Sequence, residues 1–457
     1  MPARSPATLV VLALAAAAPA AIGDDNPEKK LSPDARGKVH AWKAKDGLAY
    51  EYFVPKDYDA GDGANLTVVL HGSNLDRRWT FWNHRAGDFR PDDVVVSPDG
   101  TTPNGSGGFN FLGDDKNVSR LRALLEEVKS VLNVRQTFLY GHSQGSFFAF
   151  HFAGAHPEDV DGICADASGA WTWTKSGPFG HHQAIGIMHG TDDPVVPYGQ
   201  SRGALDHYRA NRYPLVHLRT LFGWGHPPEA RQASFVLAWC EGMTSPDPKR
   251  VQLSMEHLAE GTADFGDYAA LHAVAKRLAG TGAGAKLEGV SDSARAAAAR
   301  IADSVESLAA KHADLIRKGM KGGKEGPSPA AFHMVRFLDD FDGVPSREAL
   351  AKDMADLLDK HEKEAGKRLR VFWQKAERAP ADAFEEGVGV LKAAYLHHAA
   401  SGLLPRLAEW EKKAKELKIP KAALSAYAKA APACEKARDA GAKDYLDLNR
   451  KDGKIKP

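Results

Sequence analysis

The prediction of the fold starts from Gly141-His142-Ser143-Gln144-Gly145. The residues before this segment, 136–140, read Gln-Thr-Phe-Leu-Tyr and predict a short buried strand. The residues after it, 146–153, contain no glycine or proline and predict a helix. A strand can turn straight into a helix here only if the turn is very tight, because a Cβ atom at Gly141 or Gly145 would collide with a neighbouring strand or helix. The segment therefore predicts a strand–turn–helix unit that exposes the Ser143 hydroxyl at the turn.

Further apolar runs predict a sheet around this unit. The run at residues 66–70 is continuous rather than alternating, which is typical of a central strand buried on both faces. Further predicted strands lie at residues 94–97, 161–165, 184–188 and 215–221. Helical patterns fall between or after them, at residues 117–132, 201–211 and 229–241. Residues 39–43 and 48–54 predict a hairpin around Asp46-Gly47. Strands that alternate with helices predict an α/β fold with a mostly parallel sheet covered on both faces.

The second half of the chain has a different pattern. A chain of 457 residues is long enough for two domains, and no convincing strand follows residue 246. Glycine- and proline-containing breaks at 280–286, 322–329 and 343–345 separate segments rich in Ala, Lys, Glu and Leu. In one of these segments, apolar residues and a histidine recur at helical spacing: Ile301, Val305, Leu308, His312 and Leu315. We expect a catalytic α/β domain at 35–245 and an all-α domain of about five to seven helices at 246–457, with no repeat of fixed period.

The N-terminus predicts export. Arg4 is followed by the apolar residues 9–14, and Ala18-Pro19-Ala20 resembles a signal-peptidase site. The apolar run is too short to span a bilayer. We therefore expect residues 1–22 to be a signal peptide and the mature protein to be periplasmic or secreted, without stable membrane insertion.

Charge and cysteine content exclude several classes of partner. The formal net charge is +1, from 60 basic and 59 acidic residues, so the sequence predicts no nucleic-acid partner. Cys164, Cys240 and Cys434 form neither a disulfide framework nor a zinc motif, although one pair could still form. His181-His182 has no carboxylate or thiol partner at ligand spacing, so we predict no metal site.

The loops after two later strands supply what a serine nucleophile needs. A serine hydroxyl reacts only when a base takes its proton, and the base needs an orienting carboxylate. Asp192-Asp193 follows the strand at 184–188, and His226 follows the strand at 215–221. Because parallel strands end at the same edge of a sheet, Ser143, Asp193 and His226 should converge there. The predicted set is a catalytic triad in the chain order Ser, Asp, His.

These motifs resemble those of the α/β-hydrolases. Residues 39–242 are similar to the branch of secreted esterases that includes polyhydroxybutyrate depolymerases and feruloyl esterases. The shared motifs are Leu70-His71-Gly72, the elbow at 141–145, the acid loop at 189–197 and the histidine loop at 223–226. The resemblance implies that the acid is Asp193 rather than Asp192. It also implies an oxyanion hole formed by the backbone N–H groups of Gln144 and Ser73, with Asn74 as a weaker alternative. The glycine- and asparagine-rich loop at 101–111 has no clear counterpart in this branch.

Other residues near the expected site have less specific patterns. Trp171 and Trp173 follow the strand at 161–165, and with Asn74 they are candidates for lining a substrate pocket. His71 and His189 end strands, which favours a packed, hydrogen-bonded role over catalysis. Trp79 follows the oxyanion loop, and we expect it to pack against a helix.

The sequence thus predicts an exported serine hydrolase of carboxylic esters that needs no cofactor. The substrate could be a small or a polymeric ester, and the sequence identifies neither the acyl group nor the alcohol. One alternative is a peptidase of the prolyl-oligopeptidase type, although the β-propeller usual in that group has no counterpart here. Another is a non-catalytic binding or scaffold protein on an α/β-hydrolase fold. The partner of the helical domain and the oligomeric state stay open.

Overall fold

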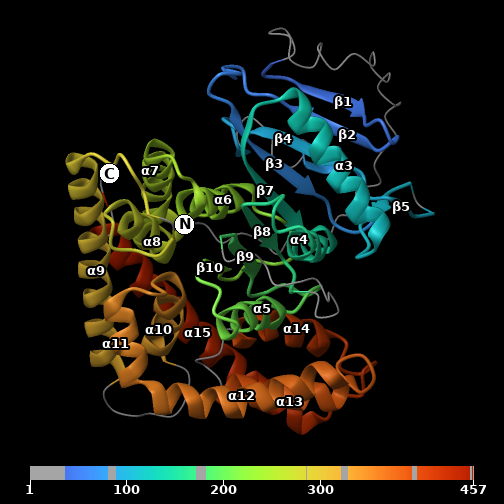
Figure 1. Ribbon diagram of the computed structural model, residues 1–457. Coiled ribbons are helices and arrows are strands. Elements are labelled where there is room, and N and C mark those ends of the chain that lie inside the picture. Colours follow the sequence, from blue (N-terminus) through green and yellow to red (C-terminus); the bar gives the residue numbers. More distant parts are fainter. Residues whose placement is uncertain are drawn as a thin grey trace.

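The computed structural model describes residues 36–80, 89–105, 107–170, 182–284, 286–320, 328–393, 399–452 and 455 (Figure 1). The predicted signal peptide and its cleavage site lie outside these residues, as do Trp171 and Trp173. In the part of the chain that is described, no helix combines the length and the apolar character needed to cross a membrane.

The first half of the chain forms one eight-stranded sheet in the order β1-β2-β4-β3-β7-β8-β9-β10. Its strands are β1 (Val39–Lys43), β2 (Ala49–Phe53), β3 (Ala64–Leu70), β4 (Val94–Pro98), β7 (Val134–His142), β8 (Gly162–Asp166), β9 (Ala184–Gly190) and β10 (Val216–Leu221). β2 is antiparallel to both β1 and β4, and all other neighbouring strands are parallel. The predicted hairpin and every predicted strand are present, within a few residues at each end. The chain has an α/β-hydrolase fold.

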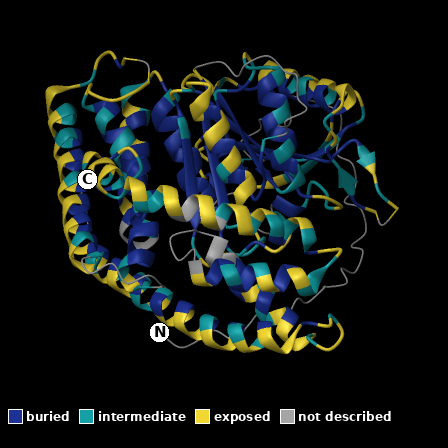
Figure 2. Cartoon of the chain, turned by 90° about the horizontal axis from the view of Figure 1, so that it is seen from below, coloured by how far each residue is buried: buried dark blue, intermediate teal, exposed yellow. Residues whose placement is uncertain are grey.

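Helices cover both faces of the sheet, and the strand residues alternate between two cores. Leu66, Val68 and Leu70 of β3 face a core shared with α3 (Asp115–Val131), α4 (Gln144–Ala155) and α5 (Gly199–Ala210). Val69 faces the opposite core, which it shares with α6 (Ala230–Thr244). Figure 2 shows the strands as buried, whereas many of the helices also carry exposed residues. This double burial explains why a central strand such as β3 is largely apolar along its length.

The second half of the chain is helical, as predicted, but it contains more helices than expected. Nine helices lie in its described part, from α7 to α15. They are α7 (Pro248–Phe265), α8 (Tyr268–Leu278), α9 (Asp292–Met320), α10 (Pro329–Asp340), α11 (Pro345–Asp353), α12 (Ala355–Lys375), α13 (Pro380–Ala393), α14 (Ala399–Lys412) and α15 (Lys421–Asp452). Among the described residues, the predicted breaks near 280–286 and 343–345 lie between helices, whereas most of the predicted break at 322–329 lies outside the described residues. The breaks that the sequence did not predict include Gly266, which ends α7 in a left-handed conformation, and Met354, which separates α11 from α12.

The predicted apolar face of α9 is correct for four of its five residues. Ile301, Val305, Leu308 and His312 are buried, but Leu315 is 45% exposed. Ile316 occupies the buried position instead. An α-helix has 3.6 residues per turn, so residues spaced seven apart do not stay on one line along it. Leu315, the last of the five predicted residues, has therefore turned away from the buried face, and Ile316 faces the core.

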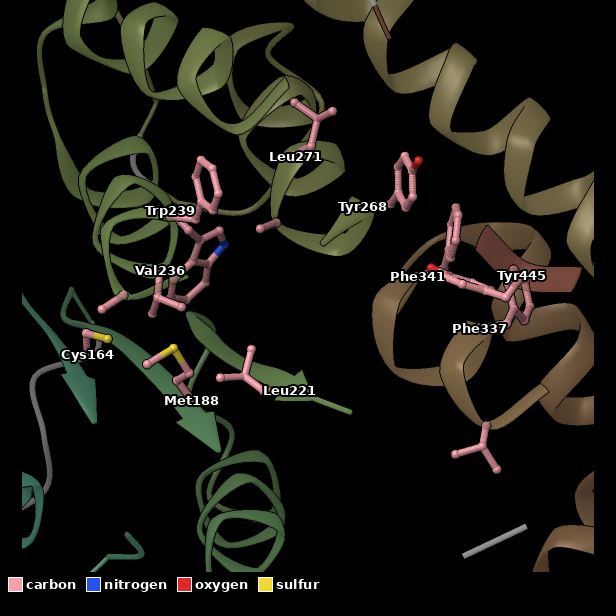
Figure 3. Packing of buried hydrophobic residues seen from close by; sticks show 14 of the residues in the cluster. Cys164, Met188, Leu221, Val236, Trp239, Tyr268, Leu271, Phe337, Phe341 and Tyr445 are labelled. Carbon is pink, nitrogen blue, oxygen red and sulfur yellow. The ribbon is translucent and has the colours of Figure 1, made fainter. Parts of the chain in front are cut away.

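One apolar core extends from the sheet into the helical half. It includes Met188 of β9, Trp239 of α6, Leu271 of α8 and Phe341 just after α10 (Figure 3). The packing between helices is close: a Cβ atom on Gly261 of α7 would lie 2.1 Å from the Phe235 ring of α6. The domain boundary near residue 245 stays a proposal, and any test of it must account for this shared core.

The three cysteines are buried and make no disulfide.

Candidate active site

Ser143 lies at the turn between β7 and α4, in a backbone conformation that non-glycine residues rarely adopt. Its φ is 52° and its ψ is −119°. Both predicted steric requirements are confirmed. A Cβ atom on Gly141 would lie 2.5 Å from the Gly145 carbonyl oxygen, and one on Gly145 would lie 2.1 Å from the Leu70 carbonyl oxygen. The backbone N–H of Ser143 donates to the Asp166 carbonyl of β8 at 2.9 Å, which fixes the turn against the sheet.

Asp193 lies in the loop after β9, where four donors surround its carboxylate. Oδ1 accepts from the backbone N–H groups of Val195 at 2.7 Å and Val196 at 2.9 Å. Oδ2 lies 3.1 Å from His189 Nε2 and 2.7 Å from His226 Nδ1. Burial alone would raise the pKa of Asp193. The hydrogen bonds from the two histidines, the charge of His226 and the Val196 N–H outweigh burial and hold the pKa well below its ordinary value. The carboxyl is therefore an anion at neutral pH.

His226 lies in the loop after β10 and meets Asp193 across the ends of two neighbouring strands. Further hydrogen bonds join the two loops. Asp192 N–H donates to the Trp224 carbonyl at 2.9 Å, and Gly223 N–H donates to Thr191 Oγ1 at 2.9 Å. The His226 side chain is 20% exposed, whereas that of Asp193 is fully buried. In this pair the buried Asp193 carboxylate contacts Nδ1 of His226, and the imidazole ring is partly exposed to solvent.

Ser143 is close to this pair but is not hydrogen-bonded to it. The ring of His142, the residue before Ser143, lies 4.9 Å from the His226 ring, centroid to centroid. Among the described residues, the Ser143 hydroxyl makes no hydrogen bond with His226. Catalytic hydrogen bonds are often long in unliganded enzymes and tighten when substrate binds, so this geometry is compatible with the predicted triad.

Asp192 has a different environment from Asp193. Its Oδ1 accepts from the Thr191 hydroxyl at 3.0 Å. In the described part of the chain, Asp192 forms no hydrogen bond or ion pair with His226. Burial raises the pKa of Asp192 to about 6, against the opposing effects of Thr191 and the charge of Arg438. The two adjacent carboxyls thus face different partners, as neighbouring side chains in an extended loop must.

The two backbone N–H groups predicted for the oxyanion hole have no hydrogen-bond acceptor among the described residues. Neither Gln144 N–H, at the start of α4, nor Ser73 N–H donates to any other described residue. The N–H of Asn74, in contrast, donates to the Phe109 carbonyl at 3.0 Å and to Asn110 Oδ1 at 3.1 Å. A Cβ atom on Gly72 would lie 3.5 Å from Ser143 Cβ, so the loop that carries Ser73 passes beside the serine. Ser73 is therefore better placed to donate than Asn74.

The glycine- and asparagine-rich loop packs against this oxyanion loop. It forms a small hairpin of β5 (Thr102–Pro103) and β6 (Phe109–Asn110). Phe109 N–H donates to the Leu75 carbonyl at 2.7 Å, and the Asn104 side chain hydrogen-bonds that of Asn74. Phe111 N–H donates to the side chain of Gln144 at 3.0 Å. The segment without a counterpart in the esterase branch thus borders the predicted oxyanion hole.

His142 and its partners were not foreseen from the sequence. Its Nδ1 lies 2.9 Å from Asp166 Oδ2, which also accepts from the Tyr140 hydroxyl at 3.3 Å. The Trp79 ring stacks on the His142 ring at 5.4 Å, so Trp79 packs against this histidine and not simply against a helix. His142 occupies the variable second position of the G-x-S-x-G pattern, where no residue type is required, so the motif could not have revealed it.

The histidines expected to be structural are buried and hydrogen-bonded. His71 Nε2 accepts from Gly100 N–H at 3.1 Å, and burial lowers the pKa of His71 to about 4. His189 Nδ1 lies 2.7 Å from Ser201 Oγ, and its Nε2 faces Asp193. His189 has one consequence beyond packing, because it helps to hold the carboxylate that contacts His226.

Within the described residues, one group has the geometry to hold a metal ion: His156, Glu158 and Asp159. The Arg122 guanidinium lies 3.4 Å from Glu158 and 3.0 Å from Asp159, so both carboxylates already have a cationic partner. This group lies at the opposite end of α4 from Ser143, because His156 follows the last residue of that helix.

Comparisons with known proteins give distant likenesses. No family model matches the chain. A bifunctional acetylxylan esterase/xylanase from Neocallimastix patriciarum is 27% identical over 184 residues, which are 37% of this chain and 25% of the relative. The chain thus spans about a quarter of the length of this curated relative.

Two solved structures illustrate the structural likeness. A Bacillus cereus carboxylesterase is 15% identical, with a TM-score of 0.35, and the match covers 42% of this chain and 93% of that one. A feruloyl esterase module from Clostridium thermocellum is 14% identical, with a TM-score of 0.34, and the match covers 45% of this chain and 87% of that one. The fold assignment rests on the strand order and the tight turn at Ser143, not on these scores.

Proposed function

We propose that this protein is an exported serine hydrolase that cleaves carboxylic esters. The observation that carries the proposal is the contact of His226 Nδ1 with the buried Asp193 carboxylate at 2.7 Å. A carboxylate on Nδ1 keeps the proton on that nitrogen and leaves Nε2 free to act as a base. Ser143, which follows β7 at the same edge of the sheet, is the hydroxyl that such a base would activate.

The proposed reaction has two stages. Ser143 Oγ attacks the ester carbonyl carbon while His226 Nε2 takes its proton, and the N–H groups of Gln144 and Ser73 stabilise the negative oxygen. His226 then gives the proton to the departing alcohol, and an acyl-enzyme forms on Ser143. A water molecule, deprotonated by His226, hydrolyses this acyl-enzyme and releases the carboxylic acid.

Two exposed apolar side chains lie on the loops that carry Asp193 and His226. Val195 on the acid loop is 63% exposed, and Trp224 on the histidine loop is 43% exposed. The Trp224 indole is held in place by a hydrogen bond from Nε1 to the Pro227 carbonyl at 2.8 Å. Rigid exposed apolar groups beside a catalytic base are suited to contact a substrate surface. The distant relative named as an acetylxylan esterase makes acetyl esters the first substrates to examine.

A fluorophosphonate probe tests the proposal directly. The probe should add covalently to the full chain, and peptide mass spectrometry should find the adduct on Ser143. Ser143→Ala should abolish labelling, whereas Ser130→Ala, which removes an exposed hydroxyl on α3, should keep it. No adduct on a folded wild-type chain would favour the non-catalytic binding protein. Faster turnover of peptide amides than of acetyl or aromatic esters would favour the peptidase.

A further inference from the structure

A cavity of about 280 Å³ lies between the helical half of the chain and the two loops that carry Asp193 and His226. Asp192, Phe222 and Gly223 line it from the sheet side. α10 and α15, which run alongside each other (Figure 1), supply the remaining lining residues: Phe332, Val335, Arg336, Arg438, Asp439 and Ala442. The cavity has mixed chemistry, with apolar walls and four charged side chains. Mixed walls of this kind are typical of sites for small organic molecules.

Of the four charged residues that line the cavity, Arg438 and Asp439 form an ion pair with each other, whereas Arg336 does not share in it. Arg438 Nε donates to Asp439 Oδ1 at 3.1 Å. The Arg336 guanidinium lies 4.7 Å from the centre of the Phe222 ring, and it makes no hydrogen bond or ion pair with any residue in the described part of the chain. Burial lowers the pKa of Arg336, which means that its charge is poorly solvated where it lies. An anion placed against Arg336 would compensate this charge.

The charged residues that line the cavity favour a carboxylate over a phosphate as the bound anion. Arg336 has no hydrogen-bonded partner among the described residues, although the charge of Asp340 acts on it, and Asp192 and Asp439 border the same space. A phosphate carries about −1.5 to −2 charges at neutral pH and would be repelled by these carboxylates. A carboxylate carries a single charge, and its two oxygens match the fork of a guanidinium. Phe332, Val335 and Ala442 favour an organic body attached to it.

We propose that this cavity binds a small organic monocarboxylate, with the carboxylate on Arg336 and the apolar body against Phe332 and Val335. A molecule bound there contacts Asp192, next to Asp193, and Gly223, three residues before His226. Because Asp192 and Gly223 are also tied to the opposite loop through Trp224 and Thr191, the ligand fixes both loops at once. The helical half thus contributes one wall of an effector site beside the catalytic loops. Binding itself does not depend on the proposed ester hydrolysis, although carboxylic acids are also products of that reaction.

Titration calorimetry of the full chain with sodium benzoate tests this inference. Benzoate has about nine non-hydrogen atoms, so a roughly millimolar dissociation constant is expected. Arg336→Gln should weaken binding at least about tenfold, because a charge-assisted pair is lost. Arg300→Gln, which removes an exposed arginine of α9, should leave the affinity unchanged. Inorganic phosphate at the same concentration should not displace benzoate.

A second variant keeps the inference testable if Arg336→Gln does not fold. Asp192→Asn removes the negative charge that faces the bound carboxylate, so it should tighten benzoate binding severalfold at pH 7. Unchanged affinity in a folded Arg336→Gln variant, or in Asp192→Asn at pH 7, would overturn the proposed site. Absence of benzoate binding to the wild type, or equal binding of phosphate, would overturn it as well. None of these outcomes depends on Ser143, so a failure here is distinct from a failure to label that serine.

Discussion

Replacing Asp193 by asparagine changes the hydrogen-bonding of His226 while preserving the size of the side chain. In the wild type, both carboxylate oxygens accept: Oδ1 from two backbone N–H groups, and Oδ2 from His189 and His226. Asparagine has one oxygen and one NH₂ group. Its oxygen will face the N–H groups of Val195 and Val196, because those two donors cannot change their role. The NH₂ group must then face His226 Nδ1.

The substitution therefore changes the tautomer of His226. When an NH₂ group faces Nδ1, that nitrogen accepts, and the ring proton moves to Nε2. An Nε2 that carries a proton cannot take one from Ser143. The fold should tolerate the change, since the loop keeps its shape and its backbone contacts. The expected loss in turnover is on the order of 10⁴-fold, the size found when the same exchange is made in a serine-protease triad.

Steady-state hydrolysis of 4-nitrophenyl acetate by the purified full chain measures this loss. Asp192→Asn is the matched control, because it makes the same chemical change one residue away, at a side chain bonded to Thr191 and not to His226. We expect Asp192→Asn to lower turnover less than about tenfold. A larger loss in Asp192→Asn than in Asp193→Asn would refute the assignment and make Asp192 the acid.

Four further predictions concern the nucleophile, the turn, the cavity and the domain boundary. Ser143→Ala should lower ester hydrolysis by about 10⁴-fold or more with the melting temperature retained; residual activity near the wild-type level would exclude Ser143 as nucleophile. Gly145→Ala should destabilise the protein by about 2 kcal/mol or more in thermal unfolding, whereas Gly203→Ala, with no atom within 4 Å of the new Cβ, should not. Benzoate affinity should fall as the pH rises through about 6, because Asp192 then becomes an anion beside the ligand, and Asp192→Asn should remove this part of the profile, leaving the part due to Asp340, whose pKa burial raises to about 7. A chain ending at Ser245 should melt below one ending at Ala279, because only the longer chain keeps α7 and α8 on α6; equal melting temperatures would support the boundary near 245.

The sheet and the turn at Ser143 were predictable because their causes are local. A continuous apolar run is required of a strand buried on both faces, and Gly141 and Gly145 are required by contacts within a few residues of the turn. The order of the strands in the sheet depends on contacts between distant segments. To place the candidate catalytic residues, however, it was enough to predict that the strands are parallel. Parallel strands end at one edge, so the loops with Asp193 and His226 had to lie near each other.

What the sequence did not predict depends on contacts between distant segments. Arg219 Nη1 pairs with Asp340 Oδ1 at 2.9 Å across 121 positions, and neither residue belongs to a recognisable motif. The pairing of His142 with Asp166 joins two strand ends, and the buried stripe of α9 is decided by the helices packed around it. The extra helices of the second half were missed because some of their breaks, such as that at Met354, contain neither glycine nor proline.

The helical half also bears on the position of His226. β10 lies at the edge of the sheet, and two of its polar side chains, Arg219 and Thr220, are buried. Buried polar groups need partners, and α10 provides them: Thr220 Oγ1 donates to Asp339 Oδ2 at 2.6 Å, and Arg219 pairs with Asp340. Asp340 is held in turn by the Tyr445 hydroxyl of α15 at 2.7 Å.

This chain of contacts runs from α15 through α10 to the strand that ends five residues before His226. A loop holds a side chain in place only as firmly as the strand before it is held, so loss of α10 should loosen His226, although α10 forms no hydrogen bond or ion pair with His226 in the described part of the chain. The same two helices line the cavity that contains Arg336. A ligand bound between them and the catalytic loops would therefore reinforce contacts that already fix β10. On this argument we propose that the helical half supports the sheet edge that carries the candidate triad, and its influence on turnover should be greatest where α10 meets β10.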